Sequence, residues 1–140
     1  MDGSTYSRSG LSFWDVRNVE RIGYIFCASK FNGDISNWDV SNVEDMSYMF
    51  MYSEFTGENC DISKWNVSNV IQMRGMFYNS KFNRDISEWN VSNVKDMSGM
   101  FYNSEFNGDI SKWNVSNVKT MNYMFYKSPL EKNPPKWYKN

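Results

Sequence analysis

The sequence contains no histidine, and its 140 residues include only two cysteines, Cys27 and Cys60. The lack of histidine excludes a Ser–His–Asp triad and every histidine-containing metal site, and the two cysteines are not spaced as metal ligands. The glycine-rich phosphate-binding motifs Gly-x-x-x-x-Gly-Lys and Gly-x-Gly-x-x-Gly are also absent. The serines recur at fixed positions without a base beside them. We therefore predict a protein that is not an enzyme and has no cofactor.

The chain also lacks a strong net charge and a long apolar run. Its formal net charge is −1, so no long-range field attracts nucleic acid or an anionic membrane. No apolar run approaches the length of a membrane span, and the polar residues 1–10 lack the apolar core of a signal peptide. We expect no nucleic-acid partner and no membrane insertion by this chain. A cytosolic protein and a piece of a longer exported protein are both compatible with this start.

What the sequence does contain is a repeat with a period of 24 residues, the interval from Trp14 to Trp38. The segment 31–50 returns from Phe82 and again from Phe106. The longer interval of 27 residues from Trp38 to Trp65 contains a three-residue insertion within the stretch 56–60. Repeats with periods of 20–50 residues are typical of solenoids and arrays. The repeated tryptophans are Trp14, Trp38, Trp65, Trp89 and Trp113.

Eight apolar positions recur in each copy, and their spacing changes within the copy. The step Trp38-x-Val40 has the period of two that is typical of a strand. The following apolar residues have the spacing of one helix face, and Ser41 to Glu44 fits a capping box. The sequence therefore predicts an α/β solenoid of strand–helix turns with a parallel sheet on one face. The residues with helical spacing are Val43, Met46, Met49 and Phe50.

We predict three parts of the chain. Residues 1–10 are expected to be a disordered N-terminal segment, residues 11–127 a five-turn repeat solenoid, and residues 128–140 a C-terminal cap. In the cap, Leu130 replaces the loop phenylalanine, Pro134 and Pro135 replace isoleucine and serine, and Trp137 keeps the tryptophan. Proline cannot donate to a ladder, so it suits a terminating edge.

The phrase Asp-Ile-Ser-x-Trp-Asn-Val-Ser-Asn-Val-x-x-Met-x-x-Met-Phe resembles the surface-protein repeats of mycoplasma-type lipoproteins, a bacterial family of unknown function. The resemblance covers about residues 11–140, including the ending Asn-Pro-Pro-Lys-Trp-Tyr. The family is similar to a distant branch of the leucine-rich repeats, whose strand pattern matches Ile35-x-x-Trp38-x-Val40. The resemblance implies a leucine-rich-repeat-like right-handed coil, a cell-surface or extracellular location, and a role in adhesion or host contact.

The outward positions of the predicted strands are the candidate binding face. One of their columns varies between copies, through Phe13, Asn37, Lys64, Glu88 and Lys112, whereas most others are uniform. A rigid, shallow and polar face suits a protein partner better than a small molecule, which requires a concave apolar pocket. We predict a module that binds a partner protein through this face. The predicted partner-binding residues are Asn37, Asp39, Lys64, Asn66, Glu88, Asn90, Lys112 and Asn114.

Two further columns, one of aspartates and one of asparagines, allow more than one interpretation. Stacked carboxylates repel one another, so either backbone donors compensate each of them or a cation such as calcium lies between them. The repeated asparagines are expected to cap helices or to form a ladder. The alternative functions are a glycan- or calcium-dependent surface-binding module and an architectural spacer of a longer surface protein. After the outward face, the loop Thr56–Cys60 that contains the insertion is the second candidate contact region. The acidic column is Asp34, Asp61, Asp85 and Asp109, and the amide column is Asn18, Asn42, Asn69, Asn93 and Asn117.

Overall fold

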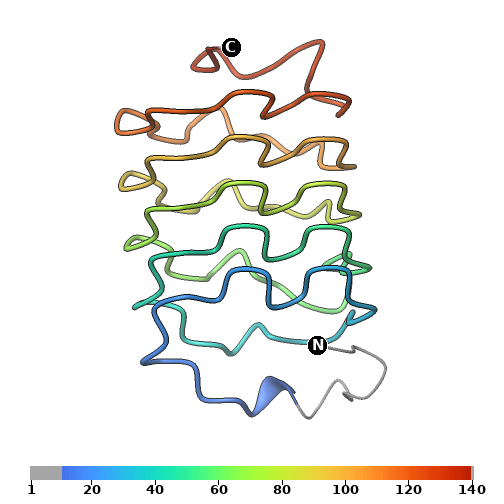
Figure 1. The fold of residues 1–140 in the computed structure, drawn as a ribbon, viewed down its shortest axis with the longest axis vertical. Helices are drawn as coiled ribbons and strands as arrows, with labels where there is room; N and C mark the ends of the chain where they lie inside the picture. Colours follow the sequence, from blue (N-terminus) through green and yellow to red (C-terminus); the bar gives the residue numbers. More distant parts are fainter. Residues whose placement is uncertain (1–10, 140) are drawn as a thin grey trace.

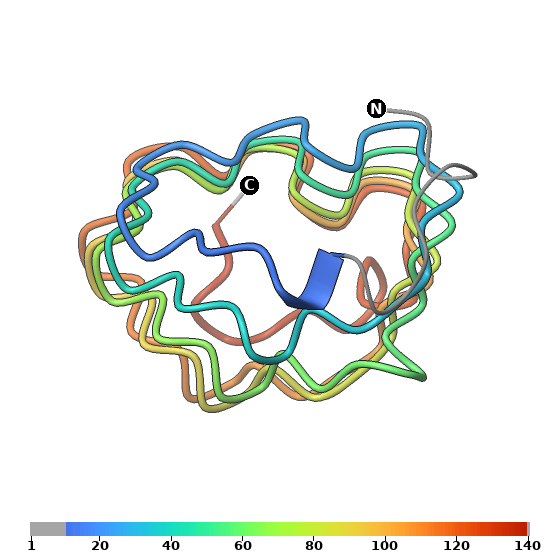
Figure 2. The same cartoon turned by 90° about the horizontal axis from the view of Figure 1, so that it is seen from below.

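The computed structural model describes residues 11–139, which form a stack of irregular coils. Figure 1 shows the chain rising from one coil to the next along the long axis of the molecule. Seen along that axis, the successive coils nearly superpose (Figure 2). The predicted disorder of residues 1–10 lies outside the described residues.

The predicted α/β solenoid is wrong, and so is its leucine-rich-repeat-like parallel sheet. Within residues 11–139, helix is assigned only at Leu11 and Ser12, and no strand is present. Pairing of the β type is limited in this range to isolated parallel bridges. No helix in the described part of the chain is long and apolar enough to cross a membrane. The bridges join Arg21 to Asp45, Asp45 to Gln72, Gln72 to Asp96, and Asp96 to Thr120.

Each coil is built instead from four-residue turns, in which a backbone N–H donates to the carbonyl oxygen three residues earlier. In such a series of turns, side chains three residues apart face the same side of the coil. Apolar residues on one face of a helix have a similar spacing of three or four residues. The spacing that suggested a helix therefore comes from consecutive turns. In one coil the donor and acceptor pairs are Trp38 to Ile35 (3.1 Å), Val43 to Val40 (2.9 Å), Met49 to Met46 (3.2 Å), Met51 to Tyr48 (3.3 Å) and Ser53 to Phe50 (3.1 Å).

Left-handed residues prevent a helix from forming in the second half of each copy. Two columns have positive φ, one between 57° and 63° and the other between 50° and 57°. A right-handed helix cannot continue through such a residue, whereas a type II turn requires one at its third position. The first column is Tyr24, Tyr48, Gly75, Gly99 and Tyr123, and the second is Ala28, Tyr52, Asn79, Asn103 and Lys127.

Backbone hydrogen bonds join each coil to the next along the wall nearest the viewer in Figure 1. Every second N–H in this wall donates to a carbonyl oxygen of the following coil. The same four bonds recur where segments 22–28, 73–79 and 97–103 meet the coil that follows each of them. This ladder fixes the register of the stack. At one junction the donor and acceptor pairs are Met46 to Gln72 (2.9 Å), Tyr48 to Arg74 (2.8 Å), Phe50 to Met76 (2.9 Å) and Tyr52 to Tyr78 (3.0 Å).

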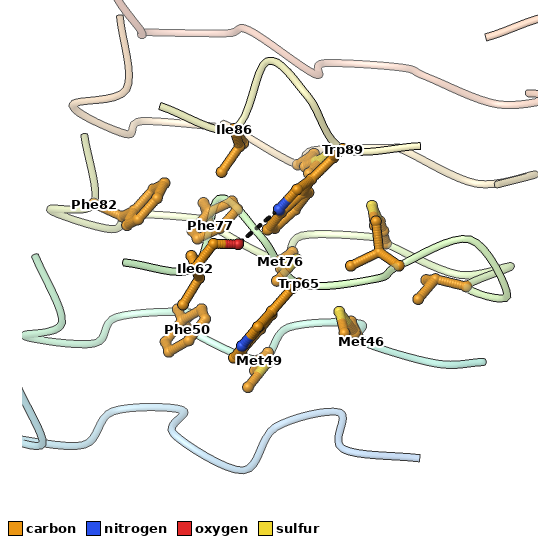
Figure 3. Packing of buried hydrophobic residues seen from close by; sticks show 14 of the residues in the cluster. Met46, Met49, Phe50, Ile62, Trp65, Met76, Phe77, Phe82, Ile86 and Trp89 are labelled. Carbon is orange, nitrogen blue, oxygen red and sulfur yellow. Dashed lines mark hydrogen bonds between the residues drawn. The ribbon is translucent and has the colours of Figure 1, made fainter. Parts of the chain in front are cut away.

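The fixed register aligns equivalent aromatic side chains in the core. Phe50, Phe77 and Phe101 are fully buried, and neighbouring ring centroids in this column lie 5.6 and 5.7 Å apart. The indoles form a second column, in which Trp65 and Trp89 stack at 6.5 Å. Figure 3 shows these two parallel indoles one above the other, with a dashed line from the Trp89 nitrogen to the Ile62 oxygen of the preceding coil.

The tryptophan hydrogen bonds satisfy a polar group inside the core. The Nε1–H of Trp89 donates to the carbonyl oxygen of Ile62 in the preceding coil, at 2.9 Å (Figure 3). The same bond recurs through the stack and links Trp137 to Ile110, also at 2.9 Å. In residues 11–139 no buried side-chain nitrogen or oxygen lacks a hydrogen-bond partner. The indoles of Trp38, Trp65, Trp89 and Trp113 therefore belong to the core and form no exposed sugar-binding surface, whereas Trp14 at the start of the column is 40% exposed.

The C-terminal residues cover the last coil. The indole of Trp137 stacks on that of Trp113, with ring centroids 6.4 Å apart. Leu130 and Tyr138 also pack against the core. These contacts shield the last aromatic rings from water, as a terminal unit of a stacked array must.

Truncation of one phenylalanine in the core column should strongly destabilise the protein. The Phe77→Ala change removes a ring that stacks on both adjacent coils, so the free energy of unfolding should fall by about 3–5 kcal/mol. Phe13 is 83% exposed, and Phe13→Ala is the matched control, with an expected effect within about 0.5 kcal/mol. Urea denaturation of both variants measures the difference, and equal losses would contradict the stacked core.

Candidate functional site

The predicted partner-binding residues are all exposed, but they do not lie on strands. They occupy turns in segments 35–43, 62–70, 86–94 and 110–118, on the wall away from the viewer in Figure 1. The prediction of an outward strand face is therefore wrong in its secondary structure. Lys64, for example, is the third residue of the turn that Trp65 closes on Ile62 at 3.2 Å. The exposed residues are Asn37, Asp39, Lys64, Asn66, Glu88, Asn90, Lys112 and Asn114.

These eight residues form two columns with different roles. In one column the side-chain oxygen accepts a hydrogen bond from the backbone N–H of the serine two residues later, and so forms a local turn. Asp39 does so with Ser41 at 3.0 Å, and Asn66 with Ser68 at 3.0 Å. Asn90 and Asn114 form the equivalent bonds at 3.1 and 3.0 Å.

The other column carries the chemical variation. Within residues 11–139, the side chains of Lys64, Glu88 and Lys112 take part in no hydrogen bond or ion pair. With Asn37 they form a row in which a positive, a negative and a positive charge follow a neutral amide. We call Asn37, Lys64, Glu88 and Lys112 the variable column. It is an exposed row that the turns do not require.

The stacked aspartates bind backbone donors in their own turns. The Ser36 hydroxyl and backbone N–H both donate to Asp34, at 2.6 and 2.9 Å, and hold the pKa of that carboxyl below its usual range. Hydroxyl and backbone donation by Ser63, Ser87 and Ser111 lowers the pKa of the other three carboxyls in the same way. In the described part of the chain, no group of three or more acidic or cysteine residues could hold a metal ion. Backbone donors therefore compensate each of these stacked carboxylates, which was the first of the two alternatives; the second was a cation between them. Those backbone bonds are 2.9 Å at Asp61, 2.8 Å at Asp85 and 3.0 Å at Asp109.

The asparagine column forms a ladder between coils and caps no helix. The Nδ2 group of Asn69 donates to the Ser41 carbonyl oxygen at 2.6 Å, and Asn93 donates to Ser68 at 2.7 Å. Asn42 bonds to Arg17 at 2.7 Å and Asn117 to Ser92 at 2.6 Å in the same register. Each of these amides thus binds a backbone group of the neighbouring coil through its Nδ2 group.

The insertion within Thr56–Cys60 is anchored to the stack at both ends. The Asn32 side-chain oxygen accepts the backbone N–H of Thr56 at 3.1 Å, and the backbone N–H of Ile35 donates to the Cys60 sulfur at 3.2 Å. Burial raises the pKa of the Cys60 thiol to about 11, so the thiol stays protonated and unreactive at neutral pH. Cys27 and Cys60 are both free. Only Glu58 and Asn59 of the insertion are exposed.

A face rich in tyrosine lies on the wall opposite the variable column, and the sequence interpretation did not single it out. The ring centroids of Tyr78 and Tyr102 lie 4.5 Å apart with nearly parallel planes. Beside them is a hollow of about 340 Å³. The signal in the sequence was a column with tyrosine in three copies and glycine in two, but the helix interpretation assigned no common surface to it. Residues lining the hollow include Tyr48, Tyr78, Gly99, Tyr102, Asn122 and Tyr123.

This arrangement defines a repeat protein of stacked turns, in which hydrogen-bonded columns form the scaffold and exposed columns carry the variation. The chain belongs to the family described as Mycoplasma protein of unknown function, DUF285, whose model matches residues 2–81 and again residues 51–138. The predicted membership of a mycoplasma-type family is thus confirmed. No curated protein and no solved structure matches the chain.

Acid should destabilise the protein through the four aspartate turns. Their carboxyl pKa values are lowered in the folded state, so their stabilisation is complete above the unfolded value of about 4 and is lost as the pH falls through the lower folded values. Urea midpoints at about pH 6 and about pH 3 measure this loss.

The quadruple change Asp34→Asn, Asp61→Asn, Asp85→Asn and Asp109→Asn keeps the accepting oxygen and removes the titrating group. This variant should lose less stability between the two pH values than the parent protein. The reverse change of Asn66, Asn90 and Asn114 to aspartate is the matched control and should increase the loss. If all three proteins show the same pH dependence, the aspartate turns are not its source.

Proposed function

We propose that this protein is a non-enzymatic module that binds a partner protein through the variable column and the exposed asparagine and aspartate column beside it. The observation that carries the proposal is the contrast between columns. The Asp34 and Asn42 columns repeat the same residue and bind the backbone, whereas the variable column changes from copy to copy and binds nothing in the described chain. A repeat retains what its fold requires, so an exposed column that changes is open to selection by a partner.

The rigidity of the wall supports this proposal. Backbone turns fix each residue of the variable column, and ladders of hydrogen bonds fix the distance between coils. A preorganised surface loses little conformational entropy on binding. Its charges alternate in sign through Lys64, Glu88 and Lys112, so the partner should present the complementary alternation. Such charges select between partners and accelerate association more than they add affinity.

The resemblance to mycoplasma-type surface lipoproteins supports a role outside the cell. We propose that the module acts at a cell surface or in the extracellular space, in adhesion or host contact. A partner there would be a host or bacterial surface protein.

Removal of the three charges should weaken partner binding and leave the fold intact. The triple change Lys64→Ala, Glu88→Ala and Lys112→Ala should raise the dissociation constant at least about tenfold, equivalent to about 1.4 kcal/mol. The melting temperature should change little, because these exposed side chains take part in no hydrogen bond or ion pair within residues 11–139. Surface proteins captured from host-cell membranes by the parent protein are identified by mass spectrometry and then titrated individually.

The matched control is Glu44→Ala, Lys95→Ala and Lys119→Ala, which removes the same charges from another exposed column. This variant should capture the same proteins as the parent protein, with dissociation constants within about twofold. The proposed face is wrong if every captured protein binds the first triple variant as tightly as it binds the control.

A further inference from the structure

The tyrosine face contains a gap in an otherwise regular column. The first left-handed column is tyrosine in three copies and glycine at Gly75 and Gly99, with the same backbone conformation at every position. Where two tyrosines are adjacent, they stack, since the rings of Tyr24 and Tyr48 lie 4.9 Å apart. The two glycines therefore remove two rings from a column of stacked rings.

A neighbouring side chain fills one of these two positions. A Cβ atom placed on Gly75 would collide with the ring of Tyr48, which lies over that glycine. The Nε–H of Arg74 donates to the Tyr48 hydroxyl oxygen at 2.9 Å and holds the ring there. Tyr48 thus occupies the space that a side chain at position 75 would take.

The position over Gly99 is vacant. A Cβ atom on this glycine would meet only Tyr78 and Tyr102, at 3.7 and 3.9 Å, which are ordinary van der Waals distances. Tyr123, the next ring of the column, is 63% exposed. The space between belongs to the hollow of about 340 Å³, near the lower end of the range for small-molecule sites. One six-membered ring fits such a volume.

Polar groups surround this vacancy. The backbone N–H of Gly99 donates to the Asn122 carbonyl oxygen at 2.9 Å, which fixes residue 122 at the edge of the hollow. The side-chain amide of Asn122 is exposed and makes no hydrogen bond within residues 11–139. Arg74, which pairs with Asp96 at 3.5 Å, also lines the hollow. An aromatic floor thus adjoins an amide that can donate and accept.

We propose that the vacancy over Gly99 binds one pyranose ring of a glycan. The C–H face of a pyranose packs on a tyrosine ring, and its hydroxyl groups can exchange hydrogen bonds with the Asn122 amide. An aromatic side chain of a protein partner would fill the ring position but would exchange no hydrogen bond with that amide, whereas the hydroxyl groups of a pyranose can both donate to it and accept from it. This site lies on the wall opposite the variable column, so it is independent of the function proposed above.

A tyrosine at position 99, the residue that three other copies carry at this position, should fill the vacancy. Gly99→Tyr places a tyrosine in a backbone conformation that Tyr24, Tyr48 and Tyr123 adopt, and no atom obstructs its Cβ. The matched control is Ala28→Tyr, which adds a tyrosine at an exposed left-handed position three coils away. Asn122→Ala is a second variant, which removes the free amide without removing a contact of the stack.

The experiment is a ¹H–¹⁵N NMR titration with the methyl pyranosides of glucose, galactose, mannose and N-acetylglucosamine, and with N-acetyltyrosinamide as the aromatic probe. We expect at least one pyranoside to bind in the millimolar range and to shift the amide signals of Gly99, Tyr102, Asn122 and Tyr123. Gly99→Tyr should weaken that binding at least tenfold and Asn122→Ala severalfold, whereas Ala28→Tyr should keep it within twofold.

Three results would overturn the proposal. The first is that no pyranoside shifts these amide signals. The second is that a pyranoside binds the Gly99→Tyr variant as tightly as it binds the parent protein. The third is that N-acetyltyrosinamide alone binds in a way that depends on Gly99. The last result would assign the vacancy to an aromatic side chain of a protein. Thermal unfolding of each variant verifies that a loss of binding does not come from a loss of fold.

Discussion

The structure depends on the ladder of backbone hydrogen bonds that joins each coil to the next. Residues with positive φ, such as Tyr48 and Tyr52, lie four residues apart in this wall, and every second N–H along it donates to the following coil. A continuous helix would use these donors internally, and a flat strand would direct successive donors to opposite neighbours. The alternation therefore produces a stack without helices or sheets. Because the register is the same at every junction, equivalent positions of successive copies meet.

This register explains the composition of the interior. Phenylalanine rings meet one another through the stack, and each indole binds a backbone carbonyl group of the coil before it. Aromatic pairs of this kind add about 0.5–1.5 kcal/mol each beyond the burial of their area. The serine, aspartate and asparagine columns bind further backbone groups, within the turns and between coils. Variation occurs at exposed positions such as Lys64 and Glu88 on one wall and at the half-buried Gly99 on the other.

Part of this arrangement follows from the sequence. The period of 24 residues, the burial of Trp65 and Met73, and an asparagine ladder as one of two alternatives are accessible without coordinates, because burial and backbone satisfaction impose them. The nature of the coil is not accessible in this way, because a spacing of three or four apolar residues describes consecutive turns as well as a helix. Gly75 and Gly99, inside the expected helices, were evidence against helix, since glycine is unfavourable in a helix interior.

The candidate surfaces show the same division. Exposure of all eight predicted contact residues followed from their alternation with Trp and Val, although turns and not strands present them. The tyrosine face could not be recognised, because its rings come together only through left-handed residues that no helical or strand pattern predicts. Tyr48 covers Gly75 and leaves Gly99 open through the hydrogen bond with Arg74, and that contact joins two coils.

The most direct test of the stacked turns is the detection of scalar couplings across hydrogen bonds by NMR. The ladder predicts a coupling between the amide nitrogen of Tyr48 and the carbonyl carbon of Arg74, and another between the amide nitrogen of Phe50 and the carbonyl carbon of Met76. Equivalent couplings are expected at every junction between coils. Couplings from Phe50 to Met46 within the same coil, as in an α-helix, would contradict the account.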